Sequence, residues 1–290
     1  MSRQLRGSLV ALALASFVAA TGPAPAGYMQ PGYDLQVIKS EQGVEHGAVS
    51  YLTNPTWGIS GLDTQVNTSF TLSACQDIRF ARLYLDIWGG TRSYTSTVSA
   101  TLNGTPLNAV NIKGYSADDN PTFDAAKTCV YGTGSGMWQV AYSGVGSLLH
   151  KDGTPNVLSF TVSDPGGSGF DGRTACASLV AVYTDTSINQ RVDYYLAEAD
   201  GTVRKTPGTN NSPAQRSLTF TGIDTANLIA ATYVAGYTHG TAGEKDQFYF
   251  NGHTLGDAAN DIALGTSSDY GPSNHSFDVT SYLATSSTVR

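Results

Sequence analysis

The alternation of apolar and polar side chains is clearest in residues 79–90, RFARLYLDIWGG. Successive side chains of an extended strand point to opposite faces, so this segment has two distinct faces. One face carries only residues typical of a core, namely Ala81, Leu83, Leu85 and Ile87. The other face combines aromatic rings with charges: Phe80, Arg82, Tyr84, Asp86 and Trp88. We therefore expect a strand whose second face is either a binding platform or another packing surface.

Other segments share the strand pattern. Residues 158–163 alternate between apolar and polar positions, residues 176–185 form a further candidate strand, and residues 33–40 and 47–54 are shorter strand-like segments. Past the N-terminal region, no long segment repeats its apolar positions every 3.6 residues. The chain is also rich in Gly, Tyr, Ser and Thr, and only 13% of its residues are charged. Pattern and composition together predict an all-β fold.

An internal repeat relates residues 69–104 to residues 218–252. In this alignment Tyr84 meets Tyr233 and Trp88 meets Tyr237, and each copy ends in an Asn-Gly pair. That pair is typical of a tight hairpin, because a type I′ turn needs positive φ at both central residues. A second pair of matching segments follows, at 138–149 and 276–287. The repeat predicts two tandem jelly-roll-like antiparallel β-sandwich domains, residues 61–190 and 191–290, preceded by a strand-containing segment, residues 27–60.

The second copy is expected to be incomplete, because the sequence given ends where two more strands are due. A sandwich without its closing strands exposes unpaired backbone groups. Three explanations stay open at this point. The sequence is a fragment of a longer chain, the segment 27–60 fills the gap, or another subunit donates a strand. The last explanation makes the protein a strand-donating filament subunit that associates with itself.

The N-terminus has the features of a secretory signal peptide, residues 1–26. Arg3 and Arg6 precede an apolar run from Leu9 to Ala20, and Ala24-Pro25-Ala26 supplies small residues for cleavage. The run is too short for a retained membrane span, so we expect a secreted or cell-surface protein without membrane insertion of the mature chain. The formal net charge of −7 becomes more negative once the leader is removed, which argues against nucleic-acid binding.

Motifs of catalysis are missing from the sequence. The five histidines show no HExxH spacing, and no GxSxG segment is present. We expect no enzyme activity and no cofactor. Acidic loops nevertheless offer the oxygen ligands that Ca²⁺ prefers, and the first choice for a structural calcium site is the loop with Asp118, Asp119 and Asp124.

The three cysteines allow one disulfide and one free thiol in an oxidising compartment. Three pairings are possible among Cys75, Cys129 and Cys176. The pair Cys75 and Cys176 is preferred, because each lies at the margin of a predicted core strand, although the geometry decides.

The repeat bears on the mixed face of residues 79–90. The candidate ligand-binding residues of the two copies are Arg82, Tyr84, Asp86, Trp88, Tyr233 and Tyr237. The rings persist in the second copy, whereas Arg82 and Asp86 become Ala231 and Ala235. A sugar site needs polar groups beside its rings. We therefore favour packing against another layer, with Arg82 and Asp86 in a cross-layer or same-face pair. A carbohydrate platform of Tyr84, Trp88 and Arg82 is the alternative.

Several segments resemble one family. They include HGAVSYLTNPTWGISGL, DIRFARLYLDIWGGT, VSATLNGTPL and FDGRTACASLVAVYTD. Over residues 32–285 the chain is similar to the domain-of-unknown-function family three-three-four-four, whose members are secreted archaeal and bacterial surface proteins. The resemblance implies export and a β fold, and it brings no catalytic residues.

The sequence as a whole thus predicts a secreted, non-enzymatic β-sandwich protein that acts as a surface, matrix or adhesive module. Its partner is an extracellular glycan or a surface protein. The alternatives are a carbohydrate-binding module of a polysaccharide-active protein and the filament subunit described above.

Overall fold

The structure is a computed structural model that describes residues 12–14, 28–29, 33–88, 94–114, 130–131, 135–167, 171–200, 215–238, 247–256 and 272–290. In these ranges the regular secondary structure consists of strands and two short 3-10 helices, η1 (Val145–Leu148) and η2 (Thr280–Tyr282). The prediction of an all-β fold is confirmed. Within the same ranges, no helix is long and apolar enough to cross a membrane.

Sheets 1 and 2 contain most strands of the first half of the chain. Sheet 1 has the order β5-β12-β7-β8, with β9 also paired to β7. Its strands are β5 (Val66–Phe70), β7 (Tyr94–Leu102), β8 (Thr105–Pro106), β9 (Val110–Gly114) and β12 (Asn156–Ser163). Sheet 2 has the order β10-β11-β6-β13-β4, with β2 also paired to β11. Its strands are β2 (Tyr28–Met29), β4 (Gly47–Pro55), β6 (Asp77–Trp88), β10 (Val130–Tyr131), β11 (Ser135–Ser143) and β13 (Thr174–Thr184).

Sheets 3 and 4 contain the strands of the second half together with two N-terminal strands. Sheet 3 has the order β19-β16-β1-β14-β3. Its strands are β1 (Leu12–Leu14), β3 (Tyr33–Glu45), β14 (Arg191–Asp200), β16 (Thr232–Thr238) and β19 (Pro272–Asp278). Sheet 4 has the order β15-β20-β17-β18. Its strands are β15 (Leu218–Thr221), β17 (Phe248–Phe250), β18 (His253–Leu255) and β20 (Ser286–Val289).

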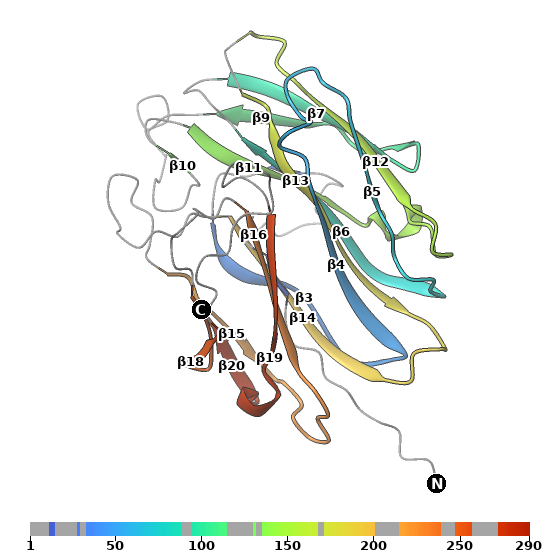
Figure 1. The fold of residues 1–290 in the computed structure, drawn as a ribbon, viewed down its shortest axis with the longest axis vertical. Coiled ribbons are helices and arrows are strands. Elements are labelled where there is room, and N and C mark those ends of the chain that lie inside the picture. Colours follow the sequence, from blue (N-terminus) through green and yellow to red (C-terminus); the bar gives the residue numbers. More distant parts are fainter. Residues whose placement is uncertain are drawn as a thin grey trace.

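The four sheets are stacked as layers in the order 1, 2, 3, 4, with three apolar cores between them. Figure 1 shows β7 and β12 of sheet 1 in the upper part of the molecule and β15 and β20 of sheet 4 in the lower part. The first core joins sheets 1 and 2, the second joins sheets 2 and 3, and the third joins sheets 3 and 4. Sheet 2 is therefore covered on both faces. This explains why β13 is largely apolar and buried from Thr174 to Tyr183 instead of alternating.

Sheets 1 and 4 have the same strand order, in which β5, β12, β7 and β8 correspond to β15, β20, β17 and β18. The two Asn-Gly turns match in detail. Asn103 and Gly104 have φ of 51° and 78°, and Asn251 and Gly252 have φ of 49° and 81°. These values are the positive φ angles that the type I′ prediction requires.

The asparagine side chains in these turns also make the same hydrogen bonds. Asn103 Nδ2 donates to the Leu148 carbonyl over 2.8 Å, and Asn251 Nδ2 donates to the Tyr282 carbonyl over 2.7 Å. Each Oδ1 accepts from the backbone of the neighbouring strand, from Val157 in one copy and from Thr288 in the other. Each asparagine therefore ties its hairpin both to a 3-10 helix and to the adjacent strand.

The sequence alignment of the two copies is wrong by one residue in β6 and β16. Arg82 pairs with Ser143, two residues before η1, and Thr232 pairs with Asp278, two residues before η2. By these anchors Tyr233 corresponds to Leu83, not to Tyr84. A slip of one residue moves a side chain to the other face of a strand. Accordingly, Tyr84 faces sheet 3, whereas Tyr233 lies in the core between sheets 3 and 4.

The gap expected in the second copy is smaller than the sequence suggested. β20 corresponds to β12 and pairs with β15 and β17, so one of the two strands expected after η2 lies within the described residues. The segment 27–60 does not supply the other expected strand of the second copy. Its strand β3 pairs with the far edge of β14, and its strand β4 pairs with β13 in sheet 2.

Candidate functional site

Three of the predicted ligand-binding residues on β6 lie between sheets 2 and 3. Tyr84 is fully buried, and Arg82 and Asp86 expose only 9% and 4% of their surface. The alternating pattern of β6 was interpreted correctly as two faces, but the second face is covered by sheet 3. The alternative of an exposed sugar platform built on Arg82 and Tyr84 is therefore wrong, because neither side chain presents a surface to a ligand.

Glu198 of β14 is the partner of Arg82 and Tyr84. Arg82 Nη2 lies 2.7 Å from Glu198 Oε1, and the Tyr84 hydroxyl donates to Glu198 Oε2 over 2.7 Å. Arg82 Nη1 also donates to the hydroxyl of Ser143. A fully buried carboxylate is stable only when it is paired and hydrogen-bonded, and both oxygens of Glu198 meet this condition. The pair links sheet 2 to sheet 3. The acidic partner of Arg82 is thus Glu198 and not Asp86.

Asp86 belongs to a second buried cluster within sheet 2. Gln139 Nε2 donates to Asp86 Oδ1 over 2.6 Å, and the Cys176 thiol donates to Asp86 Oδ2 over 3.0 Å. Burial raises the pKa of Asp86 to about 6, although these two hydrogen bonds act in the opposite direction. Burial, followed by the nearby Asp86 carboxylate, raises the pKa of the Cys176 thiol well above its usual value. Cys176 is therefore a protonated donor in a closed site and a poor nucleophile.

The predicted disulfide between Cys75 and Cys176 is wrong, since both thiols are free. The strand register gives the reason. Cys176 pairs with Asp86 at one end of β13, whereas Cys75 precedes Asp77, which pairs with Thr184 at the other end. Eight residues of extended chain span about 27 Å, far beyond the reach of a disulfide. Cys129 lies outside the described residues.

Trp88 differs from its buried neighbours on β6, because it is half-buried at the end of the strand. Its ring is 6.5 Å from that of Trp57 at an interplanar angle of 71°. The guanidinium carbon of Arg173 lies 4.0 Å from the centre of the Trp57 ring, which is a close cation–π contact. Asp171 accepts two hydrogen bonds from the Arg173 side chain, of 2.6 and 2.7 Å. We call Trp57, Trp88, Asp171 and Arg173 the tryptophan–arginine cluster.

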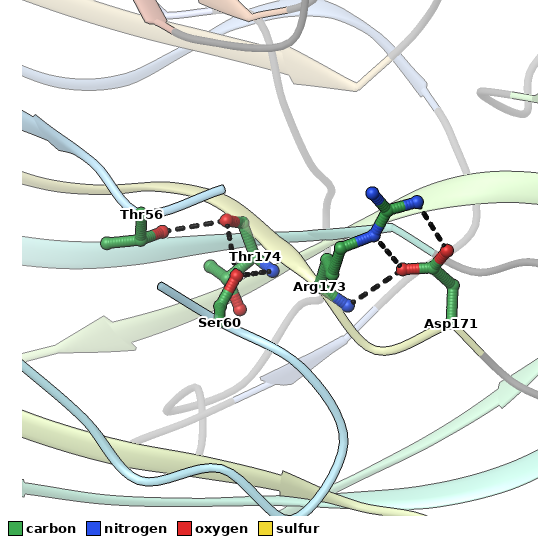
Figure 2. A network of polar contacts seen from close by, with 5 residues as sticks. All are labelled: Thr56, Ser60, Asp171, Arg173 and Thr174. Carbon is green, nitrogen blue, oxygen red and sulfur yellow. Dashed lines mark hydrogen bonds and ion pairs between the residues drawn. The ribbon is translucent and has the colours of Figure 1, made fainter. Parts of the chain in front are cut away.

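The backbone around this cluster is fixed by short polar contacts, which Figure 2 shows from close by. Thr56 Oγ1 and Ser60 Oγ both donate to the carbonyl of Thr174, over 2.8 and 3.0 Å. The Thr174 amide in turn donates to Ser60 Oγ. These bonds hold the loop after β4 against the start of β13. Trp57 is therefore presented from a rigid support beside Arg173.

The tryptophan–arginine cluster is partly exposed. Both indole rings are half-buried, and the side chains of Arg173 and Asp171 expose 41% and 23% of their surface. Aromatic faces beside a cation and a carboxylate are suited to the apolar faces and hydroxyl groups of a sugar. Among the predicted ligand-binding residues, Trp88 is the one that belongs to this surface.

The sequence analysis did not identify Trp57 or Arg173 as site residues, and both lie in segments that it used only for the family resemblance. They come together only through the pairing of β4 with β13, which neither segment specifies by itself. This antiparallel pairing brings the end of one strand to the beginning of the other.

Tyr233 and Tyr237 of β16 pack against other aromatic rings. Tyr233 is 3% exposed, and its ring lies about 6 Å from the rings of Phe248, Phe250 and Phe277. Tyr237 is half-buried and stacks on His275 at 6.0 Å. Tyr233 belongs to the core between sheets 3 and 4, so its prediction as a ligand-binding residue is wrong. The prediction for Tyr237 stays a prediction.

The described residues contain no group of three or more His, Cys, Asp or Glu side chains placed to hold a metal ion. The predicted calcium ligands Asp118, Asp119 and Asp124 lie outside those residues. His253 stacks on Tyr282 at 4.1 Å, and His46 is hydrogen-bonded to the Ile188 carbonyl, so both take part in local packing.

Comparison with known proteins gives one family. The sequence model described as "Protein of unknown function (DUF3344)" matches residues 34–290. No curated protein matches the chain significantly. Among solved structures, dimeric latent PorU from Porphyromonas gingivalis aligns with 90% of this chain at 7% identity and a TM-score of 0.33, and the chain spans 21% of the length of PorU. This structural similarity is too low to support an argument.

Proposed function

This chain belongs to a family of proteins of unknown function (DUF3344), and we propose that it is a secreted, non-enzymatic module of a cell surface, matrix or adhesive structure. The proposal concerns both where the protein works and what it does there. Each part is supported by a different set of residues.

The observation that carries the proposal is that the buried carboxylates of the interior are paired or hydrogen-bonded within the fold. Glu198 is buried against Arg82 and Tyr84, and Asp86 is buried against Gln139 and Cys176. Both clusters connect strands or layers and have no access to a substrate. Buried polar groups that are satisfied in this way rigidify a fold. A rigid stack of four sheets is suited to a load-bearing or display role outside the cell.

The N-terminal sequence supports export. The apolar run from Leu9 to Ala20 follows two arginines and precedes a small-residue cleavage pattern. The acidic net charge and the low content of charged residues agree with an extracellular β protein.

Antibody labelling of intact source cells tests the proposal. We expect labelling of intact cells or recovery of the protein from the medium, in each case with the N-terminus near Gly27. Protease treatment of intact cells should remove the cell-bound signal. A protein found only inside the cells, with residues 1–26 retained, would contradict the proposal.

A second candidate function is carbohydrate binding, and the tryptophan–arginine cluster is the observation that favours it. Two indole rings and a guanidinium lie at one edge of sheet 2, supported by the bonds of Thr56 and Ser60 to Thr174. Tyr84 and Arg82 have no part in this site.

A glycan array separates the two candidates. If the cluster binds sugars, Trp57→Ala and Trp88→Ala should each abolish a specific signal of the wild-type chain. Ile59→Ala is the matched control, because Ile59 lies in the same loop as Trp57 and exposes 58% of its surface. Equal loss in the control would indicate a general effect on the loop. Turnover of a bound polysaccharide that single carboxylate substitutions abolish would instead reveal an enzyme.

A further inference from the structure

Asp171 balances the charge of Arg173 in the tryptophan–arginine cluster. Arg173 Nε donates to Asp171 Oδ1 over 2.6 Å, and Arg173 Nη2 donates to Asp171 Oδ2 over 2.7 Å. Figure 2 shows the two planar groups side by side, with both carboxylate oxygens engaged. A two-point pair of this kind has a specific geometry and is stronger than a bond between neutral groups. The guanidinium and the carboxylate therefore act on a ligand as a polar pair without net charge.

This pairing determines which ligand charge the cluster accepts. A sugar carboxylate or sulfate that approaches Arg173 also approaches Asp171, because the two side chains are only 2.6 Å apart. Such a ligand is attracted by the cation and repelled by the carboxylate, and it must also lose its hydration. The hydroxyl group of an uncharged sugar meets no such conflict, since it can both donate to a carboxylate and accept from a guanidinium. The polar part of the cluster therefore favours an uncharged, hydroxylated ligand.

The aromatic part of the cluster sets the size of the ligand. The planes of the Trp57 and Trp88 rings differ by 71°, and the ring centres are 6.5 Å apart. A flat run of several sugar residues cannot stack on two planes that are nearly perpendicular. The guanidinium of Arg173 also lies over the Trp57 ring, which narrows the aromatic surface further. The two indoles thus form a corner for one sugar ring and not a platform for a chain.

Backbone hydrogen bonds hold this corner in place. The Trp88 amide donates to the Arg173 carbonyl over 2.7 Å, and the Gly172 amide donates to the Trp88 carbonyl over 3.1 Å. In the loop after β4, the Thr56 amide donates to the Ala175 carbonyl over 3.0 Å. Both indoles and the guanidinium are therefore attached to a fixed main chain. Little backbone entropy is lost when a ligand binds, which favours the binding of a small ligand.

We propose that the tryptophan–arginine cluster binds a single uncharged sugar residue of a glycan and discriminates against acidic sugars through Asp171. The proposal rests on the carbohydrate-binding function proposed above, to which it adds the charge and the length of the ligand.

Matched pairs of methyl glycosides test the charge. The glucose, galactose and mannose glycosides are each compared with the corresponding uronic acid, in which a carboxylate replaces the hydroxymethyl group. Binding to the full chain is followed by the indole N–H signals of Trp57 and Trp88 in NMR titrations. A neutral glycoside should bind at least about 10-fold more tightly than its acidic partner. Its affinity should change by less than about 2-fold between about 0.05 and about 0.5 M NaCl. Tighter binding of the acidic partner would overturn the proposal.

Asp171→Asn tests the origin of the discrimination. The variant keeps the size of the side chain and an acceptor oxygen, but the charge of Arg173 is no longer balanced. The preference should shift toward the acidic glycoside by at least about 10-fold, and the binding of that glycoside should weaken as the salt concentration rises. Asp152→Asn is the matched control, because it removes an exposed carboxylate next to Lys151, which pairs with Asp77 at the opposite end of β6. An unchanged preference in Asp171→Asn, or an equal shift in the control, would contradict the role of Asp171.

Oligosaccharides of the preferred sugar test the size of the site. A disaccharide and a tetrasaccharide should bind within about 3-fold of each other, because only one residue contacts the two indoles. A larger increase of affinity with length would indicate several subsites and would overturn the single-residue site.

The same titrations separate this proposal from the function on which it rests. If none of the glycosides and oligosaccharides shifts the two indole signals, carbohydrate binding and the single-residue site both fail. If a ligand binds at both tryptophans but is acidic, or gains affinity with length, carbohydrate binding stands and only the single uncharged residue is refuted.

Discussion

Arg82 and Glu198 are 116 positions apart in sequence, yet Arg82 Nη2 lies 2.7 Å from Glu198 Oε1. The two residues belong to β6 of sheet 2 and β14 of sheet 3, and both are buried. The hydroxyl of Tyr84 donates to the other oxygen of Glu198. This ion pair connects the two halves of the molecule through the core that they share.

Removal of Glu198 should strongly destabilise the protein. Glu198→Ala leaves the buried guanidinium of Arg82 without its counter-charge, which typically costs about 3–5 kcal/mol. Urea unfolding measures the effect. Arg79→Ala is the control, because Arg79 pairs with Glu41 in a more exposed place, where an ion pair contributes little to stability. The double variant Arg82→Met with Glu198→Leu should recover most of the loss. Equal effects of Glu198→Ala and Arg79→Ala would contradict the buried pair.

Asp86 should make the stability depend on pH in an unusual direction. Burial raises the pKa of Asp86 to about 6 in the folded protein, whereas an unfolded aspartate has a pKa of about 3.9. Between these values the folded state binds more protons, so the contribution of Asp86 to stability falls as the pH rises. The loss amounts to about 3 kcal/mol and is complete above pH 6.

The Asp86→Asn variant should lack this contribution. Its free energy of unfolding, measured against that of the wild type, should increase from pH 4 to pH 6 and then stay constant. A carboxyl carbon signal of Asp86 that titrates below pH 4 would refute the prediction.

Cys75 and Cys176 should be recovered as free thiols. Cys176 has no exposed surface, and burial raises its pKa, so iodoacetamide should modify it only after unfolding. Peptide mapping under non-reducing conditions provides the measurement. A crosslinked peptide that contains both Cys75 and Cys176 would disprove the strand register of β6 and β13.

The two Asn-Gly turns should respond alike to substitution. Asn103→Gly keeps the positive φ but removes the side-chain hydrogen bonds to Leu148 and Val157, for which we expect a cost of about 1–3 kcal/mol. Asn103→Ala should cost about 1 kcal/mol more, because alanine disfavours positive φ. The same substitutions at Asn251 should rank in the same order, as thermal unfolding can show. Opposite rankings at Asn103 and Asn251 would mean that the turns differ in their energetics.

The strands could be predicted from the sequence because a strand that packs one face against a core has an apolar residue at every second position. In β6 these residues are Ala81, Leu83, Leu85 and Ile87. It could not show what covers the other face. That depends on the contact between β6 and β14, which are far apart in the chain. The alignment of Tyr84 with Tyr233 failed for a related reason, since rings occur on both faces and similarity between single residues does not fix the register.

The candidate site was harder to predict than the fold. Trp57 and Arg173 come together only because β4 pairs with β13, and nothing in either segment specifies that pairing in isolation. For the same reason the disulfide could not be judged from sequence, because the pairing of β6 with β13 decides how far Cys75 lies from Cys176.

The core between sheets 2 and 3 has a practical consequence for anyone who wishes to shorten this protein. Its residues come from both halves, including Tyr84, Val180, Tyr194 and Leu196. A cut in the connection between β13 and β14 would expose a broad apolar face on each fragment. It would also separate Arg82 from Glu198, so that each fragment would keep one charge of the pair. Such fragments should precipitate or bind each other, so the chain is best handled whole.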